Sequence, residues 1–164
     1  MSTTTNPKLT LSGVRQETLN NVVNDLTQTE NVVAVVLGGS FAVGKATSTS
    51  DLDIGIYYSN KNPFDIGDIK SIANKYAIAD PTVTGFYEWG PWVNGGAWIE
   101  TASGKVDFLY RNIEQVTSTI EAAKREDWEN HFEHSRLMVL RLLFILRKPI
   151  SAFPFMILAI SLAN

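Results

Sequence analysis

The chain has 164 residues, of which 45% are hydrophobic, and this is enough for one domain with a buried core. It contains no cysteine, which excludes disulfide bonds and thiolate metal sites. The formal net charge of −3 is unevenly spread, because all 17 acidic residues lie in 1–133 against ten basic ones, while 134–164 holds only basic charges. Such an acidic body argues against binding duplex nucleic acid, whose affinity depends on Lys and Arg contacts to phosphates.

The start of the chain is polar, and we expect residues 1–11 to form a loose terminus before the domain. No early apolar segment of the kind that directs secretion follows it. Together with the absence of cysteine, this predicts a cytoplasmic protein.

The first half of the domain reads as an alternation of helices and strands. Apolar residues that include Val14 recur at helical spacing and predict a helix over 12–29, with Ser12 as its N-cap. The apolar run 32–37 predicts a strand buried on both faces. A short helix over 41–46 and a polar loop over 47–50 then lead to a strand over 51–58, where polar and apolar residues alternate.

The second half of the domain predicts a hairpin between two helices. Pro63 opens an amphipathic helix that runs to about residue 76, and 83–89 is strand-like. The strands 97–101 and 105–110 flank a Ser-Gly turn, and Asn112 is placed to cap a helix over 113–124. The chain is therefore predicted to be an α/β (α+β) protein with a mixed sheet and flanking helices.

Two short polar motifs stand between the first two predicted strands. Gly38, Gly39 and Ser40 end the first strand, and ten residues separate Ser40 from the pair Asp51 and Asp53. Carboxylates at i and i+2 share one face of a strand, where they repel each other unless a cation such as Mg²⁺ lies between them. A serine beside two glycines offers backbone N–H groups to a phosphate. These motifs together predict nucleotide chemistry.

A third carboxylate belongs to the predicted hairpin. Asp107 lies on one face of the strand 105–110, opposite Val106 and Phe108. If this strand pairs with the strand of Asp51 and Asp53, the three carboxylates meet and can bind one or two metal ions, as in an in-line phosphoryl displacement. Asp107 is also a candidate to take the proton of an attacking hydroxyl.

In this order, the motifs resemble the nucleotidyltransferase superfamily typified by DNA polymerase beta. The stretches 38–44 and 50–54 look like its bacterial small-substrate branch, which includes aminoglycoside nucleotidyltransferases and the minimal nucleotidyltransferases of toxin–antitoxin pairs. The resemblance covers about 30–112, with 12–130 as the expected domain. It implies Mg²⁺, one or two ions, and transfer of a nucleoside monophosphate, AMP from ATP, to an acceptor hydroxyl with release of pyrophosphate.

The resemblance also implies roles for particular residues. Asp51, Asp53 and Asp107 would be catalytic and would bind the metal. The glycine turn (Gly38, Gly39 and Ser40) would bind the nucleotide, and Lys45 and Ser50, on the loop between the two motifs, are further candidates. The acceptor is expected to be a small molecule. The alternatives are an antitoxin-type or regulatory protein adenylyltransferase, with a protein as acceptor, and a nucleotide-binding module without catalysis.

Two further features allow more than one interpretation. Trp89, Trp92 and Trp98 lie close together in the sequence and either pack in the core or form a wall for a base or sugar ring. The segment 131–164 is predicted as an apolar C-terminal helical segment. Pro149 and Pro154 interrupt it, so no apolar run is long enough to span a membrane. Three interpretations stay open: a core helix pair, a membrane-interface or partner-binding segment that could form a homodimer, or a truncated or altered end.

Overall fold

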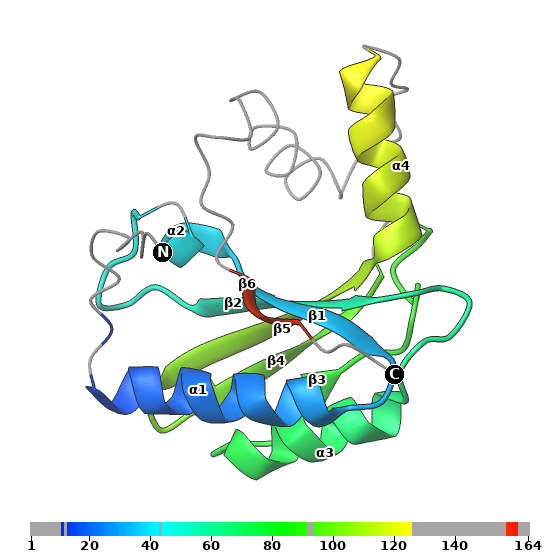
Figure 1. The fold of residues 1–164 in the computed structure, drawn as a ribbon. Helices are drawn as coiled ribbons and strands as arrows, with labels where there is room; N and C mark the ends of the chain where they lie inside the picture. The colour runs from blue at the N-terminus through cyan, green and yellow to red at the C-terminus, as the bar shows by residue number, and fades with distance from the viewer. Residues whose placement is uncertain (1–10, 12, 43, 92–93, 126–156, 161–164) are drawn as a thin grey trace.

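The computed structural model describes residues 11, 13–42, 44–91, 94–125 and 157–160, which form one mixed sheet with helices on both sides (Figure 1). The helices are α1 (Gly13–Gln28), α2 (Gly39–Ala42), α3 (Ile66–Tyr76) and α4 (Ile113–Lys124). The strands are β1 (Val32–Leu37), β2 (Leu52–Tyr58), β3 (Thr82–Val83), β4 (Gly96–Thr101), β5 (Gly104–Asn112) and β6 (Ile157–Ile160).

The sheet has the strand order β3-β4-β5-β2-β1-β6. Strands β2 and β5 run parallel, and every other neighbouring pair is antiparallel. The mixed sheet and the α+β class are therefore as predicted. The hairpin of β4 and β5 is also confirmed, and it sets β5 against the central strand β2.

One face of the sheet carries the core. Helices α1 and α3 lie side by side beneath that face in Figure 1. Alternate residues of β2 and β5 point to it and are fully buried, namely Leu52, Ile54, Ile56, Val106, Phe108 and Tyr110. The other face of β2 and β5, turned away from α1 and α3, is called the site face below. Helices α2 and α4 stand on that side (Figure 1).

Helix α1 packs through a stripe that differs from the predicted one at its start. Leu19, Val22 and Leu26 are buried at helical spacing, but the stripe begins with Arg15, whereas Val14 is 64% exposed. The prediction that Val14 belongs to the buried stripe was wrong, because it rested on the hydrophobicity of this residue alone. The polar partners that let Arg15 occupy the buried position come from loops distant in the sequence.

Helix α3 begins three residues later than predicted. Phe64 is drawn into an aromatic cluster with Tyr58, Phe86 and Tyr110, in which its ring centroid lies 5.0–5.3 Å from the others. Phe64 precedes the residue that caps the helix and so lies outside its first turn. Asp65 caps the helix instead, because its side chain accepts a hydrogen bond from Gly67 N at 2.7 Å.

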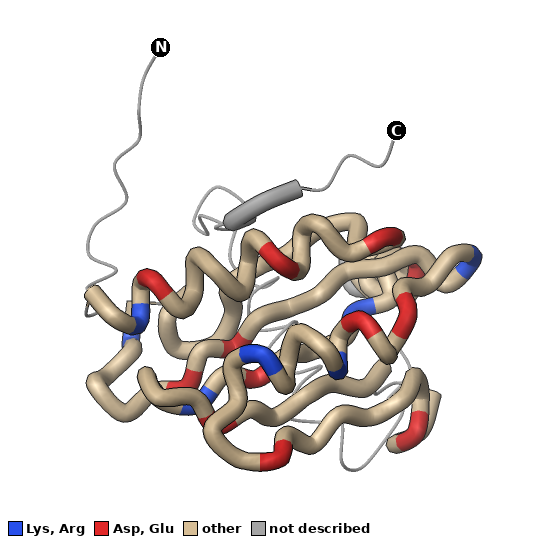
Figure 2. The backbone as a smooth tube through the Cα atoms, turned by 90° about the horizontal axis from the view of Figure 1, so that it is seen from below, with Lys and Arg blue, Asp and Glu red and all other residues tan. Residues whose placement is uncertain are grey.

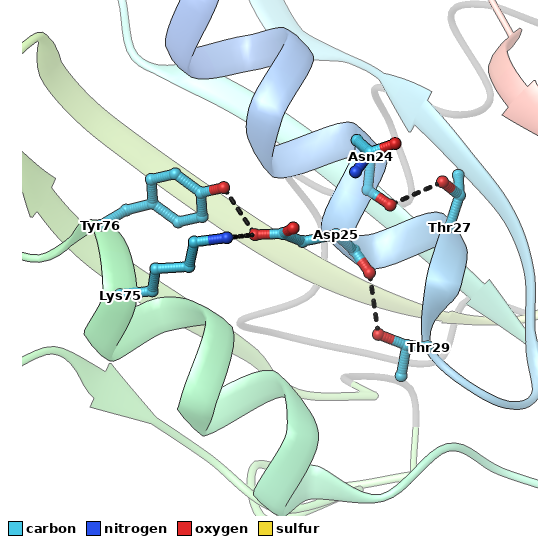
Figure 3. A network of polar contacts seen from close by, with 6 residues as sticks. All are labelled: Asn24, Asp25, Thr27, Thr29, Lys75 and Tyr76. Atoms are coloured by element: carbon cyan, nitrogen blue, oxygen red, sulfur yellow. Dashed lines mark hydrogen bonds and ion pairs between the residues drawn. The ribbon is translucent and has the colours of Figure 1, made fainter.

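Helices α1 and α3 are joined by a small polar network (Figure 3). One carboxylate oxygen of Asp25 accepts hydrogen bonds from Lys75 Nζ at 2.7 Å and from Tyr76 Oη at 2.6 Å. Burial raises the pKa of Asp25, but these two hydrogen bonds and the charge of Lys75 outweigh it and hold the pKa below its ordinary value. The network fixes the two core helices relative to each other at a distance from the site face.

Three other predictions needed correction. The short helix over 41–46 is the four-residue α2, which starts at Gly39. Strand β1 is fully buried only at Val32, Val35 and Leu37, so one of its faces is half-buried. The stretch 83–89 is not a strand beyond Val83, because Tyr87 takes a positive φ of 60° and the chain turns between Gly85 and Gly90.

The C-terminal prediction was wrong where the structure tests it. We expected a helical segment over 131–164, but Ile157–Ile160 forms β6, which pairs antiparallel with β1 at the edge of the sheet. An apolar run of this length suits a strand, and it covers the hydrogen-bonding edge that β1 would otherwise present. The remainder of that segment, Ser12 and residues 1–10 lie outside the described residues.

Charges of both signs are distributed over the described residues (Figure 2). None of their helices is both long and apolar enough to cross a bilayer. Figure 2 shows the Lys and Arg positions singly among Asp and Glu on the side of α1 and α3, without a continuous basic stripe.

Candidate active site

Two of the predicted carboxylates, Asp53 and Asp107, lie side by side near the start of the two parallel strands, and Asp51 precedes the first of these strands. Asp51 stands directly before β2, Asp53 is the second residue of β2, and both are half-buried. Because alternate residues of a strand share a face, Asp53 lies on the site face, opposite the buried Leu52 and Ile54. The parallel register places Asp107 of β5 directly beside Asp53. The conditional prediction that this strand pairs with β2 is thereby confirmed.

The glycine turn packs against Asp53. Gly38 N donates a hydrogen bond to Asp53 O at 2.7 Å, which ties the end of β1 to β2. Gly39 has a φ of +59°, and a Cβ built on it would lie 2.6 Å from Asp53 Cγ and closer still to Oδ2. Glycine is favoured there, because another residue would adopt a strained φ and its side chain would displace the carboxylate of Asp53. Ser40 follows in α2 and is half-buried.

Electrostatics link the three carboxylates. Burial raises the pKa of Asp107 to about 6, the negative charges of Asp53 and then of Asp51 add to this increase, and Lys105 opposes it. Asp107 therefore experiences the charge of both other aspartates in a partly desolvated place. A positive ion among them would relieve the repulsion.

The three carboxylates do not form a closed metal site in this arrangement. Among the described residues, no three Asp, Glu, His or Cys side chains lie close enough together to hold an ion as they stand. Their chemistry nevertheless fits Mg²⁺, because all three offer hard carboxylate oxygens from one side of the sheet.

The loop between the two motifs is held by its own hydrogen bonds. Thr47 N donates to Ser50 Oγ at 2.9 Å, and Ser50 N donates to Thr47 O at 3.2 Å. The hydroxyl of Ser50 thus closes the turn directly before Asp51. Lys45 is exposed at the other end of the loop, and its backbone N donates to Ser40 O at 2.9 Å.

Farther along the site face, Tyr57 and Arg111 lie opposite each other on β2 and β5. A Cβ at Gly55 would lie 3.2 Å from Tyr57 Cε2, so the ring leans back along β2 toward Asp53. Burial lowers the pKa of Arg111, while the nearby Tyr57 and Asp53 oppose this. A cationic side chain therefore stands within electrostatic range of Asp53.

An aromatic pair borders the carboxylates on the side away from the glycine turn. Trp98 of β4 lies directly across from Asp107 and so shares its face. Its ring packs against Trp89, with the centroids 4.8 Å apart, and Trp89 is 54% exposed. These two residues are called the tryptophan pair below. Trp92, the third of the predicted group, lies outside the described residues.

The loop that carries Trp89 is anchored by residues that the sequence analysis did not select. Tyr87 Oη accepts hydrogen bonds from Asn112 Nδ2 at 2.8 Å and from Tyr58 Oη at 3.2 Å. Asn94 Oδ1 accepts one from Asn112 N at 2.7 Å, and its Nδ2 donates to Gln115 Oε1 at 2.7 Å. No spacing pattern connects these positions, so only the folded chain reveals them.

Comparison with known proteins agrees with this geometry. The model of the nucleotidyltransferase domain family matches residues 18–160, which include the glycine turn, the three carboxylates and the tryptophan pair. The chain matches no curated protein. With a family match over most of its length and the predicted motifs gathered on one face of a mixed sheet, the chain belongs to the nucleotidyltransferase domain family.

Proposed function

We propose that this protein transfers a nucleoside monophosphate, AMP from ATP, to a hydroxyl group of a small molecule. The observation that carries the proposal is the meeting of Asp53, Asp107 and the glycine turn at one point of the site face, with Asp51 at its edge. The family supplies the reaction class, nucleotidyl transfer. The arrangement supports a site where a triphosphate lies between the glycine turn and the carboxylates.

In the proposed reaction, the acceptor oxygen attacks the α-phosphorus, and the bond from that phosphorus to the bridging oxygen breaks. Pyrophosphate leaves with the bridging oxygen and the bond's electron pair, and the acceptor hydroxyl loses its proton. Asp107 is the proposed acceptor of that proton. In the metal-free chain, burial and the neighbouring aspartates raise its pKa to about 6, so Asp107 is ionised at neutral pH and able to accept a proton.

Asp51 and Asp53, with Asp107, are the proposed ligands of one or two Mg²⁺ ions. When bound, the metal would supply positive charge against the triphosphate oxygens. The fit rests on the carboxylate donor set, and on the pKa of Asp107, which burial raises first and the charges of Asp53 and Asp51 raise further. The protein's own contribution is to hold Asp53 and Asp107 on paired strands, where the register places them side by side, with Asp51 directly before the first strand.

The glycine turn is the proposed phosphate site. Gly38 and Gly39 bring backbone rather than side chains next to Asp53, which leaves room for phosphate oxygens close to the metal ligands. Ser40 adds a hydroxyl donor, and the exposed Lys45 adds a positive charge at the end of the same segment. Ser50 is proposed to act through its backbone and the loop it closes, since its hydroxyl is engaged with Thr47.

The acceptor is proposed to approach from the side of the tryptophan pair. Asp107 separates that pair from Asp53 and the glycine turn in the strand order, so the pair flanks the proposed base and not the phosphate site. The exposed ring of Trp89 offers a flat apolar surface next to the attacking hydroxyl. A small ring-bearing acceptor fits such a surface better than a duplex does.

The test is a calorimetric titration of Mg²⁺–ATP into the whole chain and into two double variants. Asp51→Ala/Asp53→Ala removes two proposed ligands, whereas Asp68→Ala/Asp80→Ala removes the same charge from exposed positions outside the site. We expect binding to the wild type and to the second variant, and loss of binding in the first. Equal binding by all three folded proteins, or none by a folded wild type, would refute the site.

Activity is tested by pyrophosphate release with a panel of hydroxyl compounds. Release that depends on a small molecule and on Asp107 supports the proposal. Release only with an added protein would instead favour a protein adenylyltransferase. Binding of Mg²⁺–ATP without release on any acceptor would favour a nucleotide-binding module.

A further inference from the structure

Arg15 is a charged residue at a position of α1 where the helical spacing places a buried side chain. It occupies the buried stripe of α1, four residues before Leu19, and is 9% exposed. An arginine at such a position loses most of its hydration, which is unfavourable for a charged group. Contacts of the guanidinium must therefore offset this loss of hydration.

The guanidinium reaches three segments that lead into the candidate site. Nη1 donates to Ser48 O at 3.3 Å and Nη2 donates to Ser50 O, the carbonyl of the peptide that precedes Asp51. The same group lies over the ring of Phe41, with 5.5 Å from Cζ to the ring centroid, in the helix that begins at Gly39.

The third segment is the start of β5. A Cβ built on Gly104 would lie 3.3 Å from Arg15 Nη2, so the guanidinium packs against the strand three residues before Asp107. Arg15 thus touches the segment after the glycine turn, the segment before Asp51 and the segment before Asp107.

These contacts are better suited to hold the three segments in place than to stabilise the fold. The described partners of Arg15 are two backbone carbonyls and a ring, rather than a carboxylate that would neutralise its charge. Its Nε is buried without a hydrogen-bond partner, which is unfavourable. A planar group with fixed donor directions, however, can hold two carbonyls at a set spacing, which a lysine ammonium cannot.

We propose that Arg15 is a positioning residue of the nucleotide site, which fixes the Asp51 loop against α2 and the start of β5. The expected effect of Arg15 on nucleotide affinity rests on the proposed function. Its expected effect on the loop does not. Because Arg15 contacts all three segments, they keep their spacing before any nucleotide or metal binds.

The test compares Arg15→Lys and Arg15→Ala with Tyr76→Phe, a control that loosens α1 from α3 but touches none of the three segments. Mg²⁺–ATP affinity is measured by calorimetry, and folding is checked by circular dichroism. Arg15→Ala is also titrated in 20 mM guanidinium chloride and in 20 mM sodium chloride. Hydrogen exchange is followed in peptides that cover 45–52.

We expect both Arg15 variants to bind Mg²⁺–ATP at least tenfold more weakly while Tyr76→Phe binds as the wild type does. Guanidinium, but not sodium, should recover part of the affinity of Arg15→Ala, because it refills the vacated donor position. Exchange at 45–52 should be faster in both Arg15 variants only.

Three results would overturn the inference. The first is wild-type affinity in a folded Arg15→Lys or Arg15→Ala protein with unchanged exchange at 45–52. The second is an affinity loss that Tyr76→Phe reproduces, and the third is unfolding of both Arg15 variants, which would make Arg15 a stability residue. If the wild type itself fails to bind Mg²⁺–ATP, the proposed function falls and the exchange data alone decide the role of Arg15.

Discussion

Replacing Gly39 with alanine tests how closely the glycine turn and Asp53 depend on each other. The new side chain meets two obstacles. A φ of +59° costs an L-residue about 1–2 kcal/mol relative to glycine. The added Cβ would also lie 2.6 Å from Asp53 Cγ, which forces the carboxylate out of its rotamer at a further cost of about 0.5–1.5 kcal/mol.

The chain offers a matched control at Gly44. Its φ of +68° is nearly the same, but a Cβ there would have no atom within 4 Å. Gly44→Ala should therefore cost only the backbone part, about 1–2 kcal/mol. Gly39→Ala should cost about 1 kcal/mol more, from the displacement of Asp53.

Urea denaturation of both variants gives the two free energies of unfolding, and calorimetry gives their affinities for Mg²⁺–ATP. We expect Gly39→Ala alone to lose nucleotide affinity, by tenfold or more, because Asp53 is moved from its place. Equal destabilisation of the two variants, combined with unchanged affinity in Gly39→Ala, would refute the reasoning.

The remaining predictions concern charge, anchoring and the acceptor side. Because the pKa of Asp107 is raised from 3.8 to about 6 in the folded chain, ionising it costs stability, so the free energy of unfolding should fall as pH rises from about 4 to about 6, and Asp107→Asn should remove this slope. Mg²⁺ affinity, measured without nucleotide, should instead rise with pH up to about 6, because the metal needs the ionised carboxylate; a pH-independent affinity would contradict this. Asn112→Ala removes the bonds to Gln115 N and Tyr87 Oη and should cost about 1–2 kcal/mol in urea denaturation, whereas a cost below about 0.3 kcal/mol would mean that water replaces the network. Trp89→Ala should leave Mg²⁺–ATP affinity unchanged and raise the KM of any acceptor found by pyrophosphate release; an unchanged KM would place the acceptor elsewhere.

The sequence predicted the parts of the fold that depend on local pattern. Alternation of polar and apolar residues in β2 and β5 placed Asp53 and Asp107 on one face, and burial in the structure agrees with both patterns. The helix cap at Asn112 was also predicted, and its Oδ1 accepts from Gln115 N at 3.1 Å. Each of these features is decided within a few residues of the chain.

Features decided by distant contacts were missed. Arg15 looks like a surface residue until the carbonyls of Ser48 and Ser50 supply its partners. The aromatic run near Phe86 has high strand propensity, but Tyr87 turns the chain in order to reach Asn112. Likewise, no local signal indicates that Ile157–Ile160 completes the sheet beside β1 instead of extending a helix.

The parallel pairing of β2 with β5 also has a consequence for how the chain folds. Strands β1 and β2 are close in the sequence and can pair early, but Asp107 reaches Asp53 only after a loop of more than fifty residues has closed. During synthesis, the candidate site therefore stays incomplete until β5 has emerged. A nucleotide that needs both aspartates would bind only the completed sheet, so its concentration would select for the fully folded chain.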